Sequence, residues 1–212
     1  MSAAIGVLIS GRGSNLQALI DAVQDGRLEA MISLVISNRA GAGGLRRAEA
    51  AGIETLVLDH RAFKSRDDYD AALATALQAR GVTLVCLAGF MRLVGPSLLD
   101  VFPNAILNVH PSLLPAFPGV DAQGQAVAHG VRISGATVHL VTGELDGGPI
   151  VLQAAVPVLD DDTADTLAAR ILVEEHRIFP EAVQIILDGG WRVDGRRFRR
   201  GTPAISPRSA GR

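Results

Sequence analysis

The sequence predicts an α/β protein with a Rossmann-like, mostly parallel twisted sheet and helices on both faces. Short continuous apolar runs, typical of strands buried on both faces, alternate with segments whose apolar residues recur at helical spacing. Glycine accounts for 23 of 212 residues, above its usual share of about 7%, which suits many tight turns between elements. Because parallel strands need crossover connections, this alternation favours a helix-covered parallel sheet.

The predicted elements follow one another along the chain in this alternating order. Strands are expected at residues 4–10, 31–37, 53–58, 83–88, 105–110, 133–141 and 149–157. Helices are expected at residues 14–23, 43–51, 68–80 and 163–187. Gly52 and Gly81 directly follow two of these helices, as glycine often does where a helix ends. Pro180 lies inside the last helix and is expected to kink it.

The length suits one domain with a small appendage. We expect a single domain over residues 1–190, with halves at 1–100 and 101–190, and a C-terminal tail at 191–212. Residues 192–212 carry seven arginines and one aspartate, a net charge of +6, so the preceding residues carry −8 of the total of −2. The tail has two prolines and no apolar periodicity, which favours a flexible terminus over a nucleic-acid-binding segment.

Composition excludes several classes of protein. Aromatic residues are only 4%, too few for a stacking platform for single-stranded nucleic acid. The lone Cys86 lies in an apolar run, which indicates a buried core residue, and no cysteine–histidine cluster has the spacing of a metal site. Apolar runs of about ten residues are too short to span a bilayer. The N-terminus lacks a basic start and a cleavage site, so we expect a cytoplasmic protein. Because the sequence offers no metal-ligand cluster, we also expect no metal.

A glycine-rich turn follows the first predicted strand and leads into the first helix. Gly11 and Gly13 let the backbone approach a ligand, and Ser14 and Asn15 bring the positive end of the helix to the same place. The turn is neither a Walker loop nor a full dinucleotide fingerprint, since Leu16 stands where the third glycine would be. It therefore suits a single phosphate monoester. A plain glycine turn, with Ser14 or Asn15 as the helix cap, explains it equally well.

A polar pair ends the strand expected at residues 105–110. Asn108 and His110 point to the same face because strand side chains alternate. An amide and an imidazole on one face can together stabilise negative charge on an oxygen. The alternative is a histidine that merely bonds a backbone carbonyl. The prolines that follow His110 hold the loop in one shape, which favours the functional interpretation.

A second candidate turn contains Asp146 followed by Gly147 and Gly148. Aspartate is common in turns, but a carboxylate that reaches His110 would orient the ring and favour its charged form. His139 is a second candidate partner that we interpret as a supporting or core residue. Ligands of parallel sheets bind beyond the carboxyl ends of strands. That rule selects the loops at 11–15, 89–94, 108–119 and 142–148.

Five stretches of this sequence together resemble the folate-dependent glycinamide ribonucleotide formyltransferases. They are residues 9–17, 87–92, 107–115, 135–139 and 145–149. They occur in the order of that family between residue 4 and about residue 188, and the tail falls outside the resemblance.

The resemblance implies a role for each matched position. Gly13, Ser14 and Asn15 would hold the phosphate of the ribonucleotide, and Glu175 would meet its ribose. The positions that would contact the folate are Arg66, Met91, Arg92, Leu93, Val94 and Asn108. The catalytic residues would be Asn108, His110 and Asp146. Asp121 stands where some members of the family have histidine, so no role is carried over to it.

The resemblance also implies the reaction. A formyl group would pass from 10-formyltetrahydrofolate, a co-substrate, to the amine of glycinamide ribonucleotide in purine (IMP) biosynthesis, through a tetrahedral oxyanion intermediate. The expected partners are these small molecules, with no nucleic acid, membrane or metal. The sequence does not fix the oligomeric state.

Three alternatives remain open. Formyltetrahydrofolate hydrolases share the Asn108, His110 and Asp146 elements, but they carry a preceding regulatory domain for which this chain offers no room. Methionyl-transfer-RNA formyltransferases share the central motif, but they need a C-terminal RNA-binding domain. A non-catalytic mononucleotide-binding regulator would use residues 11–15 alone.

Overall fold

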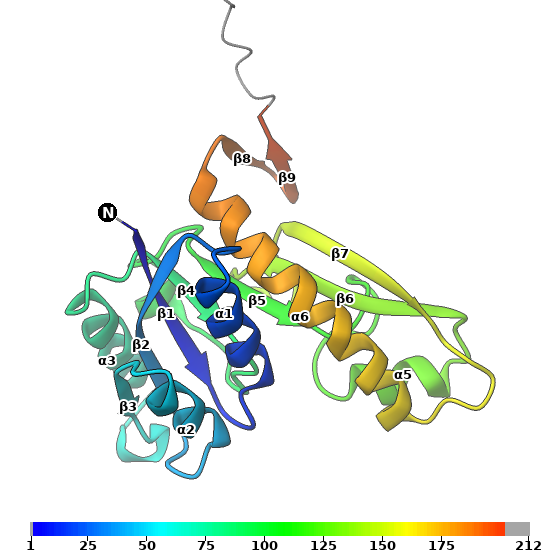
Figure 1. The fold of residues 1–212 in the computed structure, drawn as a ribbon, viewed down its shortest axis with the longest axis horizontal. Helices are drawn as coiled ribbons and strands as arrows, with labels where there is room; N and C mark the ends of the chain where they lie inside the picture. Colours follow the sequence, from blue (N-terminus) through cyan, green and yellow to red (C-terminus); the bar gives the residue numbers. More distant parts are fainter. Residues whose placement is uncertain (1, 202–212) are drawn as a thin grey trace, which may run out of the picture.

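A nine-stranded sheet forms the centre of the computed structural model, which describes residues 2–201. The strands lie in the order β3-β2-β1-β4-β5-β6-β7-β9-β8 (Figure 1). Their bounds are β1 Ala3–Ile9, β2 Ala30–Ser37, β3 Thr55–Val57, β4 Leu84–Leu87, β5 Ile106–His110, β6 Ile133–Leu140, β7 Ile150–Pro157, β8 Trp191–Asp194 and β9 Arg197–Arg200. The first five strands along the chain pair in parallel, which confirms the predicted fold class.

The sheet changes direction after β5. Strand β6 is antiparallel to both β5 and β7. Only residues 141–149 connect β6 to β7, too short a segment for the crossover that a parallel pair requires. Strand β9 then pairs in parallel with β7 and antiparallel with β8, so the second half of the sheet is mixed.

Helices cover both faces of the sheet. Their bounds are α1 Ser14–Gln24, α2 Gly43–Ala50, α3 Arg66–Gln78, α4 Pro96–Leu99, α5 Ala122–Ala128 and α6 Ala164–Asp188, with a short 3₁₀ helix η1 at His60–Ala62. Helices α1, α2, α5 and α6 bury apolar residues in one hydrophobic cluster, and α3 and α4 bury theirs in the other. Helix α6 continues through Pro180, whose side chain is buried.

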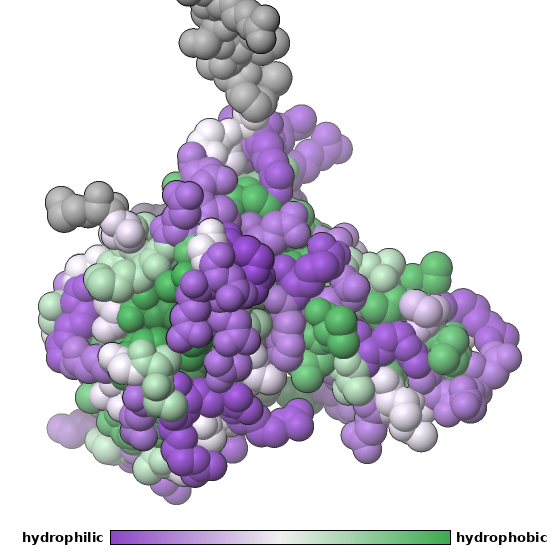
Figure 2. All heavy atoms as spheres, in the orientation of Figure 1, coloured by the Kyte–Doolittle hydropathy of each residue, from purple (hydrophilic) through white to green (hydrophobic). Residues whose placement is uncertain are grey.

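Burial matches the apolar pattern of the sequence. Residues 5–9 of β1 and all of β4 are buried, and they include Cys86, as predicted. Burial raises the pKa of the Cys86 thiol to about 12, so it stays protonated and unreactive. On the face that α1 and α6 cover, hydrophilic side chains dominate the surface, as expected for amphipathic helices (Figure 2).

Residues 191–200 are not the flexible tail that the sequence predicted. They form the hairpin β8–β9, which extends the sheet through the pairing of Ile150 with Arg197. Trp191 stacks on Phe198 with ring centroids 5.3 Å apart, and the Trp191 indole N–H donates to the Ile186 carbonyl. The stacking and hydrogen bond of Trp191 hold the hairpin on the sheet despite the arginine-rich composition that suggested a flexible tail. Residues 202–212 lie outside the described residues.

The short elements α4, α5 and η1 were also missed, because each is too short for its periodicity to stand out. Strand β3 covers only part of the 53–58 stretch expected as a strand. Within residues 2–201, no helix combines the length and apolar character needed to cross a membrane.

Candidate active site

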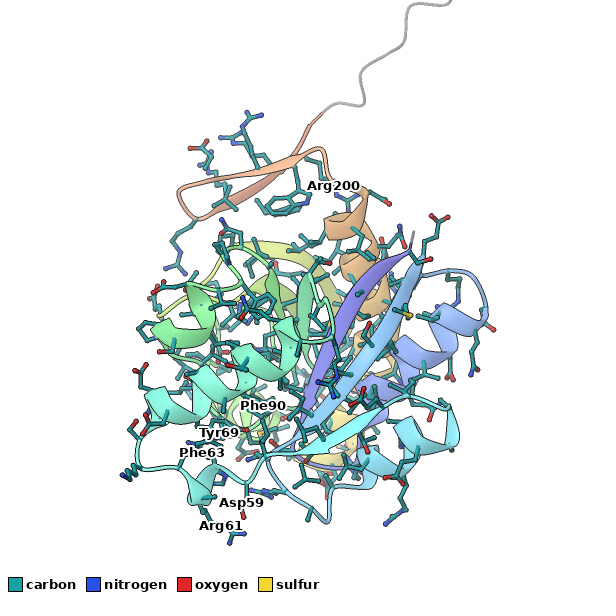
Figure 3. The ribbon with its side chains drawn as sticks, turned by 90° about the vertical axis from the view of Figure 1, so that its left-hand side faces the viewer. Asp59, Arg61, Phe63, Tyr69, Phe90 and Arg200 are labelled. Atoms are coloured by element: carbon teal, nitrogen blue, oxygen red, sulfur yellow. The ribbon has the colours of Figure 1, made fainter. Side chains whose placement is uncertain are left out.

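Neighbouring strands bring the candidate residues to one region of the sheet. Strands β1, β4 and β5 are adjacent and parallel, so the segments that follow them meet at the same edge. Figure 3 places Phe90, which follows β4, at this end with Phe63 and Tyr69, whereas Arg200 of the β8–β9 hairpin lies at the opposite end.

Asn108 and His110 share one face of β5, as predicted. Asn108 pairs across the ladder with His139 of β6, and His110 pairs with Thr137. The Asn108 amide nitrogen lies 3.1 Å from His139 Nε2. The other ring nitrogen of His139, Nδ1, lies 3.0 Å from the Leu140 carbonyl, to which it can only donate.

These contacts fix the roles of both groups. Burial lowers the pKa of His139, although the Leu140 carbonyl and Asp146 oppose this effect. A neutral His139 with its proton on Nδ1 accepts a hydrogen bond from Asn108 at Nε2. This bond uses one of the two amide hydrogens of Asn108, and within residues 2–201 the second has no hydrogen-bond partner. Asn108 is therefore an oriented donor with one free N–H.

Both ring nitrogens of His110 face acceptors. Nε2 lies 2.9 Å from the Phe117 carbonyl and must donate to it. Nδ1 lies 3.5 Å from Asp146 Oδ2, so a doubly protonated ring satisfies both neighbours. A histidine that merely bonds a backbone carbonyl would show only the contact with Phe117. The contact between Asp146 and the other ring nitrogen goes beyond that alternative and favours the functional interpretation.

Asp146 is held firmly in place. Its side chain is only 9% exposed, and its Oδ2 accepts the Gly119 N–H at 2.7 Å. Its Oδ1 lies 3.8 Å from His139 Nε2, so the carboxylate faces two histidines. The backbone of Asp146 has φ +50°, a left-handed conformation that aspartate and asparagine tolerate better than most residues.

The turn that carries Asp146 reaches the site by a route that the sequence did not predict. We expected residues 142–148 to follow the carboxyl end of a parallel strand. Strand β6 is antiparallel, and Leu140 at its end pairs with Leu107 near the start of β5. The turn therefore folds back along the sheet to bring Asp146 to His110.

The glycine-rich turn forms the N-terminus of α1. Gly13 is the N-cap, with φ +73°, and no side chain caps this helix. The expected alternative, a cap formed by Ser14 or Asn15, is therefore wrong. A Cβ on Gly13 would lie 2.5 Å from the Gly44 Cα, so the turn packs directly on the start of α2.

Asn15 and Glu175 lie together although 160 residues separate them in sequence. The Asn15 amide nitrogen donates to Glu175 Oε2 at 2.7 Å. Glu175 is only 7% exposed, whereas a glutamate in a helix is ordinarily exposed to solvent. Burial raises the pKa of Glu175, and the Asn15 hydrogen bond partly offsets this. The buried Asn15 Oδ1 has no partner among the described residues.

The segment at 91–94 follows β4 and exposes apolar side chains. Met91 is 68% exposed and Leu93 is 49% exposed. The Arg92 guanidinium lies 5.3 Å from the centroid of the Tyr69 ring, so Arg92 stacks on α3. Arg66, the first residue of α3, is exposed, and its Cδ lies within 3.8 Å of where a Cβ on Gly95 would be.

Sequence reasoning missed Asp70. This buried residue of α3 accepts the Gly95 N–H at 2.7 Å and so anchors the end of the 91–94 segment. Burial raises its pKa, while that hydrogen bond and the nearby Arg66 and Arg92 lower it. A signal existed, because Asp70 stands in the apolar stripe that Leu73 and Leu77 continue.

Asp121 plays a local role. It is the N-cap of α5, with φ +55°, and its side chain accepts the Gly124 N–H at 3.2 Å. Within residues 2–201, no group of three or more histidine, cysteine, aspartate or glutamate side chains is arranged to hold a metal.

The fold and the site define an α/β protein with a histidine–carboxylate pair and an oriented amide on one face of the sheet. An uncapped helix N-terminus lies at the end of a neighbouring strand. The chain belongs to the formyl transferase family, which matches residues 3–183.

Known proteins similar to this chain carry related names. It is 45% identical over 183 residues to the phosphoribosylglycinamide formyltransferase of Escherichia coli, covering 86% of each chain. It is 46% identical over 187 residues to the human trifunctional purine biosynthetic protein adenosine-3, covering 88% of this chain but only 18% of the human protein. The glycinamide ribonucleotide transformylase 1 structure from Symbiobacterium toebii superimposes with a TM-score of 0.93 at 56% identity, covering 95% of each chain.

Proposed function

We propose that this protein transfers a formyl group from 10-formyltetrahydrofolate to the amine of glycinamide ribonucleotide, a step of purine biosynthesis. The observation that carries the proposal is the convergence of Asp146 Oδ2 on His110 Nδ1 at 3.5 Å, on the sheet face that Asn108 shares. Membership of the formyl transferase family and the names of the similar proteins support the same reaction.

The substrate amine attacks the formyl carbon, and the formyl oxygen becomes an oxyanion. The free N–H of Asn108 donates to that oxyanion without any rearrangement. Protonated His110 adds positive charge nearby. For His110 to donate directly to the oxyanion, its ring must give up either the hydrogen bond to the Phe117 carbonyl or the contact with Asp146. Each preorganised donor of this kind typically lowers the activation barrier by ~3–4 kcal/mol.

The intermediate then breaks the bond between the formyl carbon and N10 of the folate. The proton lost by the amine must reach N10, and Asp146 with His110 provides the group able to accept and return it. The products are the formylated amide and tetrahydrofolate, so no covalent enzyme intermediate and no oxidant are needed.

Two further regions would hold the substrates. The N–H groups of Ser14 and Asn15, at the uncapped start of α1, suit a phosphate monoester, which gains from the helix dipole. Glu175 is positioned by Asn15 and offers an acceptor for ribose hydroxyls. The backbone of residues 91–94 would line the pterin pocket, with Arg66 at its rim.

An absorbance assay for folate release, run with and without glycinamide ribonucleotide, tests the proposal. Release that requires the ribonucleotide, together with a formylated amide found by mass spectrometry, supports it. Release without the ribonucleotide would instead identify a formyltetrahydrofolate hydrolase. Ribonucleotide binding with no release under any condition would leave a non-catalytic binding protein. The absence of a metal requirement and a cytoplasmic location stay predictions.

A further inference from the structure

A buried chain of hydrogen bonds joins the ends of three neighbouring strands. Ser10 directly follows β1 and is 3% exposed. Its hydroxyl accepts the Met91 N–H at 2.9 Å and donates to Asn38 Oδ1 at 2.7 Å. Asn38, also 3% exposed, directly follows β2. Ser10 thus connects the segment after β4 with the segment after β2.

The direction of every bond in this chain is fixed. A backbone N–H can only donate, so the Ser10 oxygen must accept from Met91 and its own hydrogen must go to Asn38. The Asn38 carbonyl oxygen is then occupied, and its amide nitrogen lies 3.4 Å from His60 Nδ1. Hydrogen bonds that donate in one direction strengthen one another in a buried site.

Two backbone hydrogen bonds, the stacking of Arg92 on Tyr69 and the packing of Val94 on the core anchor the 91–94 segment. Its Met91 and Leu93 side chains are largely exposed and hold it only weakly. Ser10 fixes its start through the Met91 N–H, and Asp70 fixes its end through the Gly95 N–H. Gly89, with φ +74°, turns the chain so that its own carbonyl accepts the Ser10 N–H at 3.1 Å while Met91 returns to the Ser10 hydroxyl.

We propose that Ser10 is a positioning residue for the formyl-folate. It sets the backbone of residues 91–94, whose N–H and C=O groups would recognise the pterin ring, and the ribonucleotide turn starts at the very next residue. One side chain therefore ties the two substrate regions to the same strand end. The identity of the ligand rests on the proposed function. The hydrogen bond by which Ser10 anchors the Met91 N–H does not depend on that function.

The test compares Ser10→Ala with Ser37→Ala. Ser37 is a matched control, because it is a buried serine at the end of the adjacent strand, and among residues 2–201 its hydroxyl bonds only the backbone of Arg39. Ser10→Ala leaves the Met91 N–H without its acceptor. We expect its KM for formyl-folate to rise about 5- to 30-fold, the effect of one lost hydrogen bond, with kcat and the ribonucleotide KM changed less than about twofold. Ser37→Ala should leave all three constants near those of the unaltered protein.

A second measurement does not depend on catalysis. Hydrogen exchange of the Met91 amide, measured by NMR without ligand, should accelerate in Ser10→Ala and not in Ser37→Ala. If Ser10→Ala does not fold, Asn38→Ala removes the acceptor of the Ser10 hydroxyl and should shift both readouts in the same direction by a smaller factor.

Two results would overturn the inference. One is equal Met91 exchange in both serine variants. The other is a formyl-folate KM in Ser10→Ala that matches the control or rises no more than the ribonucleotide KM. Calorimetry of the unaltered protein with formyl-folate separates this failure from failure of the proposed function. A protein that does not bind formyl-folate refutes the function, while the exchange measurement still decides the anchor.

Discussion

Replacing Asp146 with asparagine tests the proposed chemistry most directly. Asparagine has the same shape, keeps an oxygen for the Gly119 N–H, and tolerates the φ of +50° at this position. Alanine would lose that hydrogen bond and strain the backbone. Asp146→Asn therefore removes the charge while leaving the turn in place.

The size of the effect follows from the distance to His110. Opposite charges 3.5 Å apart attract by about 5 kcal/mol at an effective dielectric constant of ~20. The substituted side chain keeps a dipole, and His110 keeps its bond to Phe117, so only part of this energy is lost. We expect kcat to fall by about 10²–10³, which corresponds to ~3–4 kcal/mol.

The assay is folate release at saturating concentrations of both substrates, with ribonucleotide affinity measured by calorimetry. Affinity should stay within about twofold, because the phosphate turn is distant in sequence and separately anchored. Glu144→Gln is the matched control, since Glu144 belongs to the same turn but is exposed and pairs with Arg196 at 3.0 Å. A folded Asp146→Asn protein that keeps more than about a tenth of its turnover would refute the reasoning.

The remaining predictions concern other parts of the structure. Ser14→Ala keeps the backbone N–H but removes a hydroxyl that can also donate to the phosphate, so it should raise the ribonucleotide KM about tenfold and the folate KM much less; equal effects in steady-state kinetics would argue against the phosphate turn. Gly13→Ala is a poor substitute, because its Cβ would meet Gly44 and φ is +73°, so it should lower thermal stability as well. Burial raises the pKa of Glu175 above its ordinary value of 4.5, so the ionised form is disfavoured in the folded protein and stability falls as pH rises through the raised pKa. Glu175→Gln should therefore unfold at a higher temperature than the unaltered protein at pH 8, lose that advantage near pH 4, and bind the ribonucleotide more weakly; equal melting temperatures at pH 8 would contradict this. Cys86, buried and with a pKa of about 12, should react with a thiol reagent only after denaturant unfolds the protein, and fast labelling of the native protein would contradict the fold.

The sequence by itself determined the class of fold and the local parts of the site. Alternating strand and helix patterns predicted the parallel half of the sheet, and the two-residue period of strands placed Asn108 and His110 on one face. These features depend on neighbours in the chain, whose spacing the sequence states directly. The β8–β9 hairpin also left a signal in the alternation of Trp191 and Val193, but the arginines between and after them concealed it.

Only the tertiary structure decided which distant groups meet. It brought Asn15 to Glu175 across 160 residues and joined Ser10 to both Asn38 and Met91. The contact between Asp146 and His110 depends on the reversal of β6, which sends the turn back along the sheet instead of beyond its end. Strand direction and order come from the packing of the whole core, and no local pattern of residues contains that information.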